Sequence, residues 1–177
     1  MTASPASPLR GEPIGEVVDG FRVAVVNEHA VRFAARTLFG VGVVGWTVAV
    51  TTGEFAFARG FAILFLLEMG IRLGAGARFA PLYALGSRIG RTREPLWVGA
   101  PQKGFAWGLG FVLSITSCFA FGWLGIPVLA LTICGVCLAI LGAEAIFGWC
   151  VGCAIYGRLW PDKTFHCADG SCAVNVR

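Results

Sequence analysis

Two pairs of cysteines near the end of the chain are the residues best suited to chemistry by type and spacing. Cys150 and Cys153 form a C-x-x-C pair in the stretch GWCVGCAIYG, and Cys167 and Cys172 follow in a polar segment beside His166. A C-x-x-C pair can undergo reversible thiol–disulfide chemistry or pass on a sulfur atom. Four thiolates can instead hold zinc or an iron–sulfur cluster.

Three interpretations of these cysteines stay open at this stage. In a thiol site, Cys150 and Cys153 are the working pair, and Cys167 and Cys172 are auxiliary residues that resolve an intermediate. In a metal site, the same four residues and His166 are the ligands, although the spacing C-x2-C-x13-C-x4-C is looser than that of common zinc sites. In the third interpretation all four are small packing residues, because free cysteine is common in protein interiors.

The predicted position of the first pair argues against a simple thioredoxin-like nucleophile. The apolar run from 127 to 156 predicts one long helix, which places Cys150 and Cys153 near its C-terminal end. The negative end of a helix dipole disfavours a thiolate, whereas thioredoxin-like cysteines are activated at a helix N-terminus. Arg158 and Lys163 would offset part of this effect.

Several charged residues lie inside the apolar segments, and three of them are candidate site residues. Glu68 and Arg72 are four residues apart, which suits an ion pair within one helix, and Glu144 lies in the last apolar run. A carboxylate in hydrocarbon costs several kcal/mol unless it is paired or protonated, so we expect partners among Arg72, Lys103, Asn27 and Arg32. These residues predict either a polar clasp between the second and fourth helices or a path for protons or substrate.

The composition predicts an all-α integral membrane protein. Of the 177 residues 56% are hydrophobic and only 14% are charged, and the mean hydropathy is +0.75. A soluble chain of this size has too much surface to hide so many apolar side chains. Runs long enough to cross the bilayer predict a bundle of four transmembrane helices at about 33–52, 55–73, 105–123 and 127–156.

The segments around these helices complete the predicted organisation. Residues 1–16 predict a disordered cytoplasmic tail, and 17–159 form the four-span membrane domain. That domain begins with an N-terminal interfacial amphipathic helix over 17–36, where charged and apolar side chains alternate. A polar loop is predicted over 74–104, and residues 160–177 form a short cytoplasmic tail that contains cysteines.

The distribution of basic residues predicts the orientation. Of the 14 Lys and Arg residues, only Arg59 adjoins the first short turn, and the turn before Pro127 has none. The positive-inside rule then places both termini in the cytoplasm, in a multi-pass protein of the inner (cytoplasmic) membrane. The net charge of +4 suits anionic lipid headgroups, and the absence of a basic face with interleaved aromatics predicts no nucleic-acid partner.

Several motifs resemble those of the bacterial membrane family called domain of unknown function 4395. The similarity runs from about 27 to 159 and is carried by Asn27, Glu68 with Arg72, Ala100-Pro101, FAWGLGFVLS and GAEAIFGWCVGCAIYG. It implies a small multi-span membrane protein, and a thioredoxin-like or sulfurtransferase partner. A basic residue directly precedes the phenylalanine in that family, whereas Gly104 separates Lys103 from Phe105 here. This departure weakens any role that the resemblance would assign to Lys103.

The leading interpretation is a membrane protein with a cytoplasm-facing cysteine site for thiol–disulfide redox chemistry or sulfur relay. Cys150 and Cys153 lead the candidate residues, and zinc or iron–sulfur is the cofactor only if these cysteines bind metal. The alternatives are a non-catalytic scaffold in the lipid bilayer, a metal-binding membrane protein, and a small transporter that uses Glu68 and Glu144. A transporter of four helices leaves little room for a pathway in one copy, so it would need a homo-oligomer.

Overall fold

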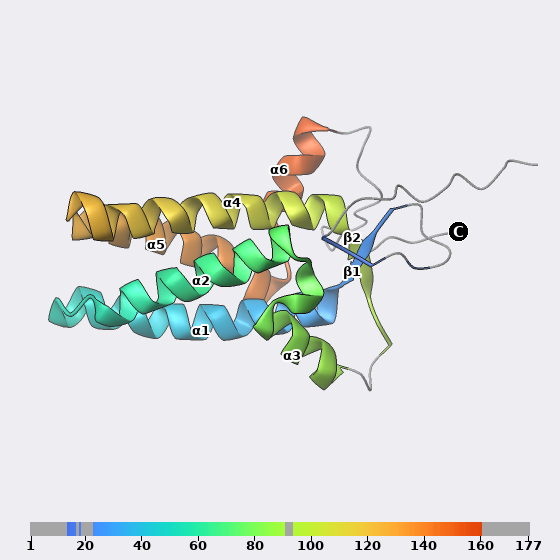
Figure 1. The fold of residues 1–177 in the computed structure, drawn as a ribbon, viewed down its shortest axis with the longest axis horizontal. Coiled ribbons are helices and arrows are strands. Elements are labelled where there is room, and N and C mark those ends of the chain that lie inside the picture. Colours follow the sequence, from blue (N-terminus) through green and yellow to red (C-terminus); the bar gives the residue numbers. More distant parts are fainter. Residues whose placement is uncertain (1–13, 17, 19–22, 91–93, 161–177) are drawn as a thin grey trace, which may run out of the picture.

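The fold is an elongated bundle of long helices with shorter elements gathered at one end (Figure 1). The computed structural model describes residues 14–16, 18, 23–90 and 94–160. The long helices are α1 (Glu28–Thr52), α2 (Ala56–Gly74), α4 (Ala100–Phe119) and α5 (Pro127–Gly142). The last two continue as single π-helical turns, η3 (Ala120–Leu124) and η4 (Ala143–Phe147).

Three of the long helical segments suit a bilayer by length and composition. They are Glu28–Thr52, Ala100–Leu124 and Pro127–Phe147, and they support the predicted membrane character. Helix α2 covers nearly the whole predicted second span, but it carries Arg59, Glu68 and Arg72 within its 19 residues. The count of four spans therefore stays a prediction.

The bundle is built from two helical hairpins. Left-handed Gly53 (φ 74°) ends α1, and left-handed Gly125 (φ 62°) ends η3. Both turns lie at the end of the bundle remote from the short sheet (Figure 1). Pro127 then begins α5, because proline suits the first turn of a helix, where its missing N–H costs nothing. Helix α2 packs against α4, and α1 packs against both α2 and α5.

The start of the membrane domain differs from the prediction. Strand β1 (Val25–Asn27) pairs antiparallel with β2 (Trp97–Gly99), with Val26 opposite Val98, and Glu16 pairs with Val25. Asn27 then caps α1 by accepting a hydrogen bond from the His29 N–H at 3.0 Å. In the described part of 17–36, the predicted separate interfacial helix is therefore replaced by a strand and the first turns of α1. Residues 1–13 of the predicted disordered tail lie outside the described residues.

The predicted polar loop over 74–104 contains regular structure. It holds the short helical turn η1 (Ala77–Phe79), α3 (Pro81–Ile89), β2 and the first residues of α4. Glu68 explains the position of α3, because its carboxylate accepts hydrogen bonds from the N–H groups of Leu82 at 3.3 Å and Tyr83 at 3.1 Å. A carboxylate at a helix N-terminus satisfies N–H groups that have no partner within the helix.

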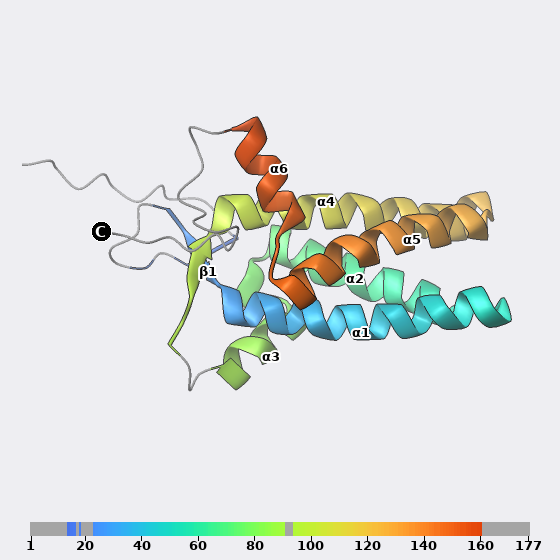
Figure 2. The ribbon, with the colours of Figure 1, turned by 180° about the vertical axis from the view of Figure 1, so that it is seen from behind.

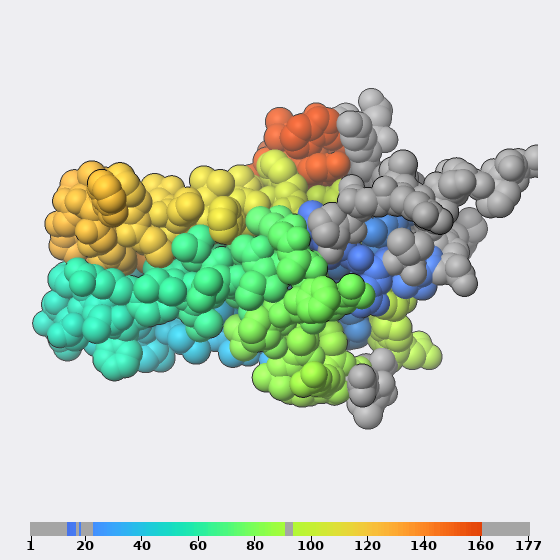
Figure 3. Space-filling model, viewed as in Figure 1, coloured from blue at the N-terminus to red at the C-terminus, as the bar shows by residue number. Residues whose placement is uncertain are grey.

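The predicted single helix over 127–156 is wrong, because the chain breaks at Gly148. This residue has a left-handed φ of 71°, and its N–H turns back to the carbonyls of η4. A separate helix, α6 (Val151–Leu159), follows and crosses α4 instead of continuing along the bundle (Figures 2 and 3). At its end Tyr156 and Trp160 pack on Phe105 with ring centroids 5.7 and 5.8 Å away. Tyrosine and tryptophan are residues that favour a membrane–water interface.

Candidate functional site

The break before α6 reverses the predicted environment of the C-x-x-C pair. Cys150 is the N-cap of α6, and its sulfur accepts a hydrogen bond from the Cys153 backbone N–H at 3.2 Å. The prediction that the pair lies at a helix C-terminus is therefore wrong. The positive end of the α6 dipole is directed at the Cys150 sulfur, which favours its thiolate.

The two thiols are held in different protonation states. The pKa of Cys150 is lowered because the Cys153 thiol and N–H donate hydrogen bonds to its sulfur and because Lys103 is positively charged; these effects outweigh burial. The pKa of Cys153 is raised because its thiol is the donor to Cys150 and because it is buried. This asymmetry is what a nucleophile and a resolving thiol require.

Lys103 is the central charge of a buried network beside the pair. Its side chain is 2% exposed, and its ammonium donates a hydrogen bond to Glu144 Oε1. Glu28 Oε2 lies 3.0 Å from the same nitrogen in an ion pair, and Glu28 Oε1 accepts a hydrogen bond from Arg32 Nε at 3.0 Å. The two positive charges, on Lys103 and Arg32, therefore balance the two negative charges, on Glu28 and Glu144. These residues belong to α1, α4 and η4. Lys103 was one of the expected partners of the carboxylates, and it is the partner of Glu144.

Helix α1 also holds the break itself in place. Arg36 Nε donates a hydrogen bond at 3.0 Å to the carbonyl of Ala145, inside η4. The guanidinium of Arg32 packs directly against Gly148, where an added Cβ would lie 2.7 Å from Nη2. Turns of π-helix are often found at functional sites. In this chain the turn gives Glu144 and Cys150 positions that a straight helix would not provide.

Glu68 and Arg72 form a second, separate network. Arg72 Nη2 donates to Glu68 Oε1 at 2.8 Å, as the four-residue spacing predicts, and both side chains are buried. The Arg72 guanidinium also lies over the Trp107 ring, 5.1 Å from its centroid. The predicted clasp between the second and fourth helices is therefore two networks. One joins α2 to α3, and the other joins Glu144 to α4 and α1.

The other predicted ligands lie outside the described residues. These are Cys167, Cys172 and His166, so the proposed four-cysteine arrangement stays a prediction. Within the described ranges, no three His, Cys, Asp or Glu side chains come together as metal ligands would. Cys134 instead contacts Ser117 through its sulfur at 3.1 Å, in a packing cluster at the remote end of the bundle.

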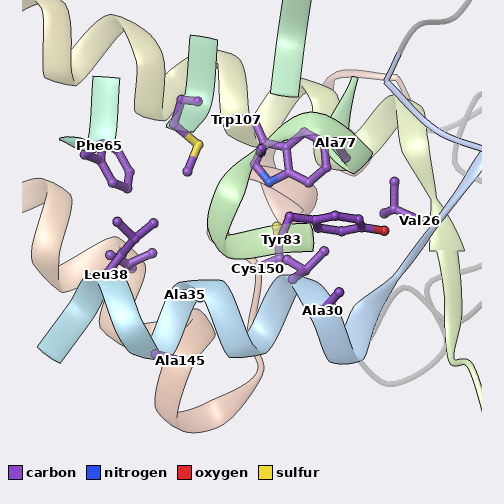
Figure 4. Close-up of a cluster of buried hydrophobic side chains, with 14 of the residues drawn as sticks. Val26, Ala30, Ala35, Leu38, Phe65, Ala77, Tyr83, Trp107, Ala145 and Cys150 are labelled. Carbon is purple, nitrogen blue, oxygen red and sulfur yellow. The ribbon is translucent and has the colours of Figure 1, made fainter. Parts of the chain in front are cut away.

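Cys150 borders a cavity between the helices. Cys150 is 5% exposed and Cys153 is 3% exposed, and both belong to the main hydrophobic cluster. Figure 4 shows Cys150 in this cluster with Trp107 and Leu38. A cavity of about 70 Å³ touches Cys150 and is otherwise lined mainly by apolar side chains of α2, α4, α5 and α6. In the described part of the chain, Cys150 is therefore approached through a mainly apolar space.

The fold and site define a class of protein: a helical bundle with three segments long and apolar enough to cross a membrane, buried ionic networks and a C-x-x-C pair at one end. The family model described as domain of unknown function 4395 matches residues 26–160, so the chain belongs to that family, as its motifs predicted. Searches of curated proteins and of solved structures found no match.

Proposed function

We propose that this protein is a thiol–disulfide redox protein of the membrane, with Cys150 as nucleophile and Cys153 as resolving thiol. The observation that carries the proposal is the helix break at Gly148, because it brings the Cys150 sulfur to the α6 N-terminus and within hydrogen-bond distance of the Cys153 N–H. The reversible step joins the two sulfurs in a disulfide and releases two electrons and two protons to an acceptor.

The proposal includes four membrane spans with both termini in the cytoplasm. Helix α2 packs beside α4 over much of its length and pairs its inward charges, so α2 can share the bilayer with the three more apolar segments. The broken end of α5 and the aromatic cluster on α6 would then lie at the inner leaflet. A thioredoxin-like or sulfurtransferase partner would exchange electrons or sulfur there, assisted by Cys167 and Cys172.

Serine variants test the pair directly. Treatment of the purified protein with diamide, a small thiol oxidant, is expected to join Cys150 to Cys153, as detected by mass spectrometry of peptides. Cys153→Ser should keep a reactive Cys150 that forms mixed disulfides with added thiols. Alkylation of Cys153 in Cys150→Ser should be at least about tenfold slower than alkylation of Cys150 in Cys153→Ser, because only the Cys150 sulfur caps the N-terminus of α6.

The matched control for these variants is Cys118→Ser, which changes a partly buried cysteine elsewhere in α4. It should leave the diamide-induced disulfide unchanged. The proposal is wrong if diamide yields no Cys150–Cys153 disulfide in the folded wild type.

The pH dependence of alkylation tests the asymmetry of the pair. The rate at Cys150 follows its thiolate fraction, and a lowered pKa means that this fraction rises at lower pH than in a free cysteine. Half-maximal alkylation of Cys150 should therefore fall below about pH 8.5, the value of an unperturbed thiol. Cys153 should stay unreactive over the same range because its pKa is raised. Equal profiles for the two residues in mass-resolved alkylation would contradict this expectation.

A non-catalytic scaffold is the second candidate, and one observation favours it. The Glu28–Lys103–Glu144 network ties α1, α4 and η4 together, and such networks can serve architecture alone. This alternative predicts that Cys150→Ser and Cys153→Ser leave every cellular function of the protein unchanged, which a complementation assay under oxidant stress would show.

A further inference from the structure

The cavity beside Cys150 opens on the apolar outer face of the bundle. Leu109, Ile140 and Ile155 line it, and these residues are 37%, 37% and 40% exposed. They belong to α4, α5 and α6, whose exposed faces are apolar and suit acyl chains. An apolar molecule dissolved in the bilayer would therefore reach the cavity sideways, without crossing an aqueous surface.

The inner lining of the cavity offers one unused hydrogen-bond donor. Arg72 lines the cavity and is 2% exposed, and its Nε–H has no acceptor among the described residues. Its Nη2 is already engaged with Glu68. A buried donor without an acceptor costs roughly 1–3 kcal/mol, so a ligand with a carbonyl oxygen would gain by supplying the acceptor. The Trp107 ring, which also lines the cavity, offers a flat apolar surface.

We propose that this cavity binds the ring of a lipid-dissolved quinone, which is the membrane-side electron acceptor of the Cys150–Cys153 pair. The inference rests on the proposed thiol function and specifies its partner. A quinone fits because it combines an apolar ring, a carbonyl oxygen for Arg72 Nε–H, and an apolar tail that can leave between Leu109 and Ile140 into lipid.

The electrons and atoms balance in two steps. The Cys150 thiolate adds to a ring carbon of the quinone and forms a C–S bond, and the ring oxygen takes up a proton. Cys153 then loses its proton and attacks Cys150 Sγ, which forms the S–S bond and breaks the C–S bond. The electron pair of that bond stays with the ring, which takes a second proton and leaves as quinol. One dithiol is thus oxidised and one quinone is reduced by two electrons.

The size of the cavity sets how the ring would lie. Its volume of about 70 Å³ is roughly half the 150 Å³ of an engineered apolar cavity that encloses benzene. One edge of the ring would therefore lie inside the cavity, near Cys150 and Arg72. The rest of the ring would lie at the mouth of the cavity, between the exposed side chains of Leu109, Ile140 and Ile155. A bulky side chain at the mouth should block this position without changing the thiols.

The test uses the full chain in lipid nanodiscs, reduced and then mixed with decylubiquinone without oxygen. Wild type is expected to form quinol, measured by ultraviolet absorbance, and one Cys150–Cys153 disulfide for each quinol. Ile140→Trp at the mouth should slow this reaction by at least about tenfold, which corresponds to 1.4 kcal/mol. The matched control Val136→Trp lies one turn earlier on α5, is also exposed and does not line the cavity, so it should react like wild type.

Diamide separates failure of this inference from failure of the proposed function. If diamide forms the disulfide but decylubiquinone does not, the quinone partner is wrong and the thiol function stands. If neither oxidant forms it, the thiol function itself is wrong. Arg72→Lys, which keeps a positive charge for Glu68 but removes the Nε–H, should raise the KM for decylubiquinone and leave oxidation by diamide unchanged. Equal quinone oxidation in Ile140→Trp and wild type would also overturn the inference.

Discussion

Lys103→Met is expected to destabilise the protein more than any other single substitution near the cysteine pair. Methionine has a similar length and is apolar, but it leaves Glu144 and one oxygen of Glu28 without their cation. Glu28 is 1% exposed, so water cannot replace the lost partner. Removing one member of a buried ion pair typically costs about 3–5 kcal/mol, and we expect a loss of that size in the free energy of unfolding.

The same variant should change the chemistry of Cys150. Loss of the positive charge removes one of the effects that lower the pKa of Cys150, so its pKa should rise. The alkylation profile of Cys150 should therefore move to higher pH, with slower alkylation at neutral pH. Chemical unfolding in detergent and mass-resolved alkylation measure the two effects separately.

Two further variants make the Lys103 prediction specific. Lys103→Met combined with Glu144→Gln should recover part of the lost stability, because the double variant buries one fewer unpaired carboxylate. Arg59→Met replaces an exposed cation of α2 that pairs with no carboxylate among the described residues, and it should change stability by less than about 0.5 kcal/mol. If Lys103→Met is as stable as wild type and the pH dependence of Cys150 alkylation is unchanged, the network neither stabilises the fold nor lowers the pKa of Cys150.

Gly152→Ala is expected to displace α6 from α4. The added Cβ would lie 2.5 Å from the Cβ of Ala106 and 2.6 Å from its Cα, so the backbone of α6 has to move. Overpacking of this kind costs about 1–3 kcal/mol. The movement would also disturb the hydrogen bond from Cys153 N–H to Cys150, because both ends of that bond belong to the first turn of α6 and its cap.

The matched control is Gly108→Ala on α4, where an added Cβ meets no atom within 4 Å. It should fold at least as stably as wild type, since alanine favours a helix over glycine. Thermal unfolding in detergent compares the two variants, and diamide treatment reports whether the disulfide still forms. If both glycine variants behave alike, the close contact between α6 and α4 does not decide the geometry of the site.

The sequence by itself determined the apolar helical class, the family and the two hairpins. These follow from properties that act locally: long apolar runs, glycine at the turns, and proline at the start of α5. The Glu68–Arg72 ion pair also follows from local spacing, because residues four apart lie on one face of a helix. The spacing of Cys150 and Cys153 is also a local feature, so the sequence alone identifies the C-x-x-C pair.

Only the tertiary structure decided the environment of those cysteines. Gly148 is one of 25 glycines, and glycine is common inside apolar helices, so nothing local marks it as a break. The break depends on Arg32 and Arg36 of α1, which contact Gly148 and Ala145 across the bundle. Lys103 was one of four expected partners of the carboxylates, and spacing along the chain could not choose among them. Its partner Glu144 is 41 residues away, and such a distant contact is fixed by packing and not by spacing.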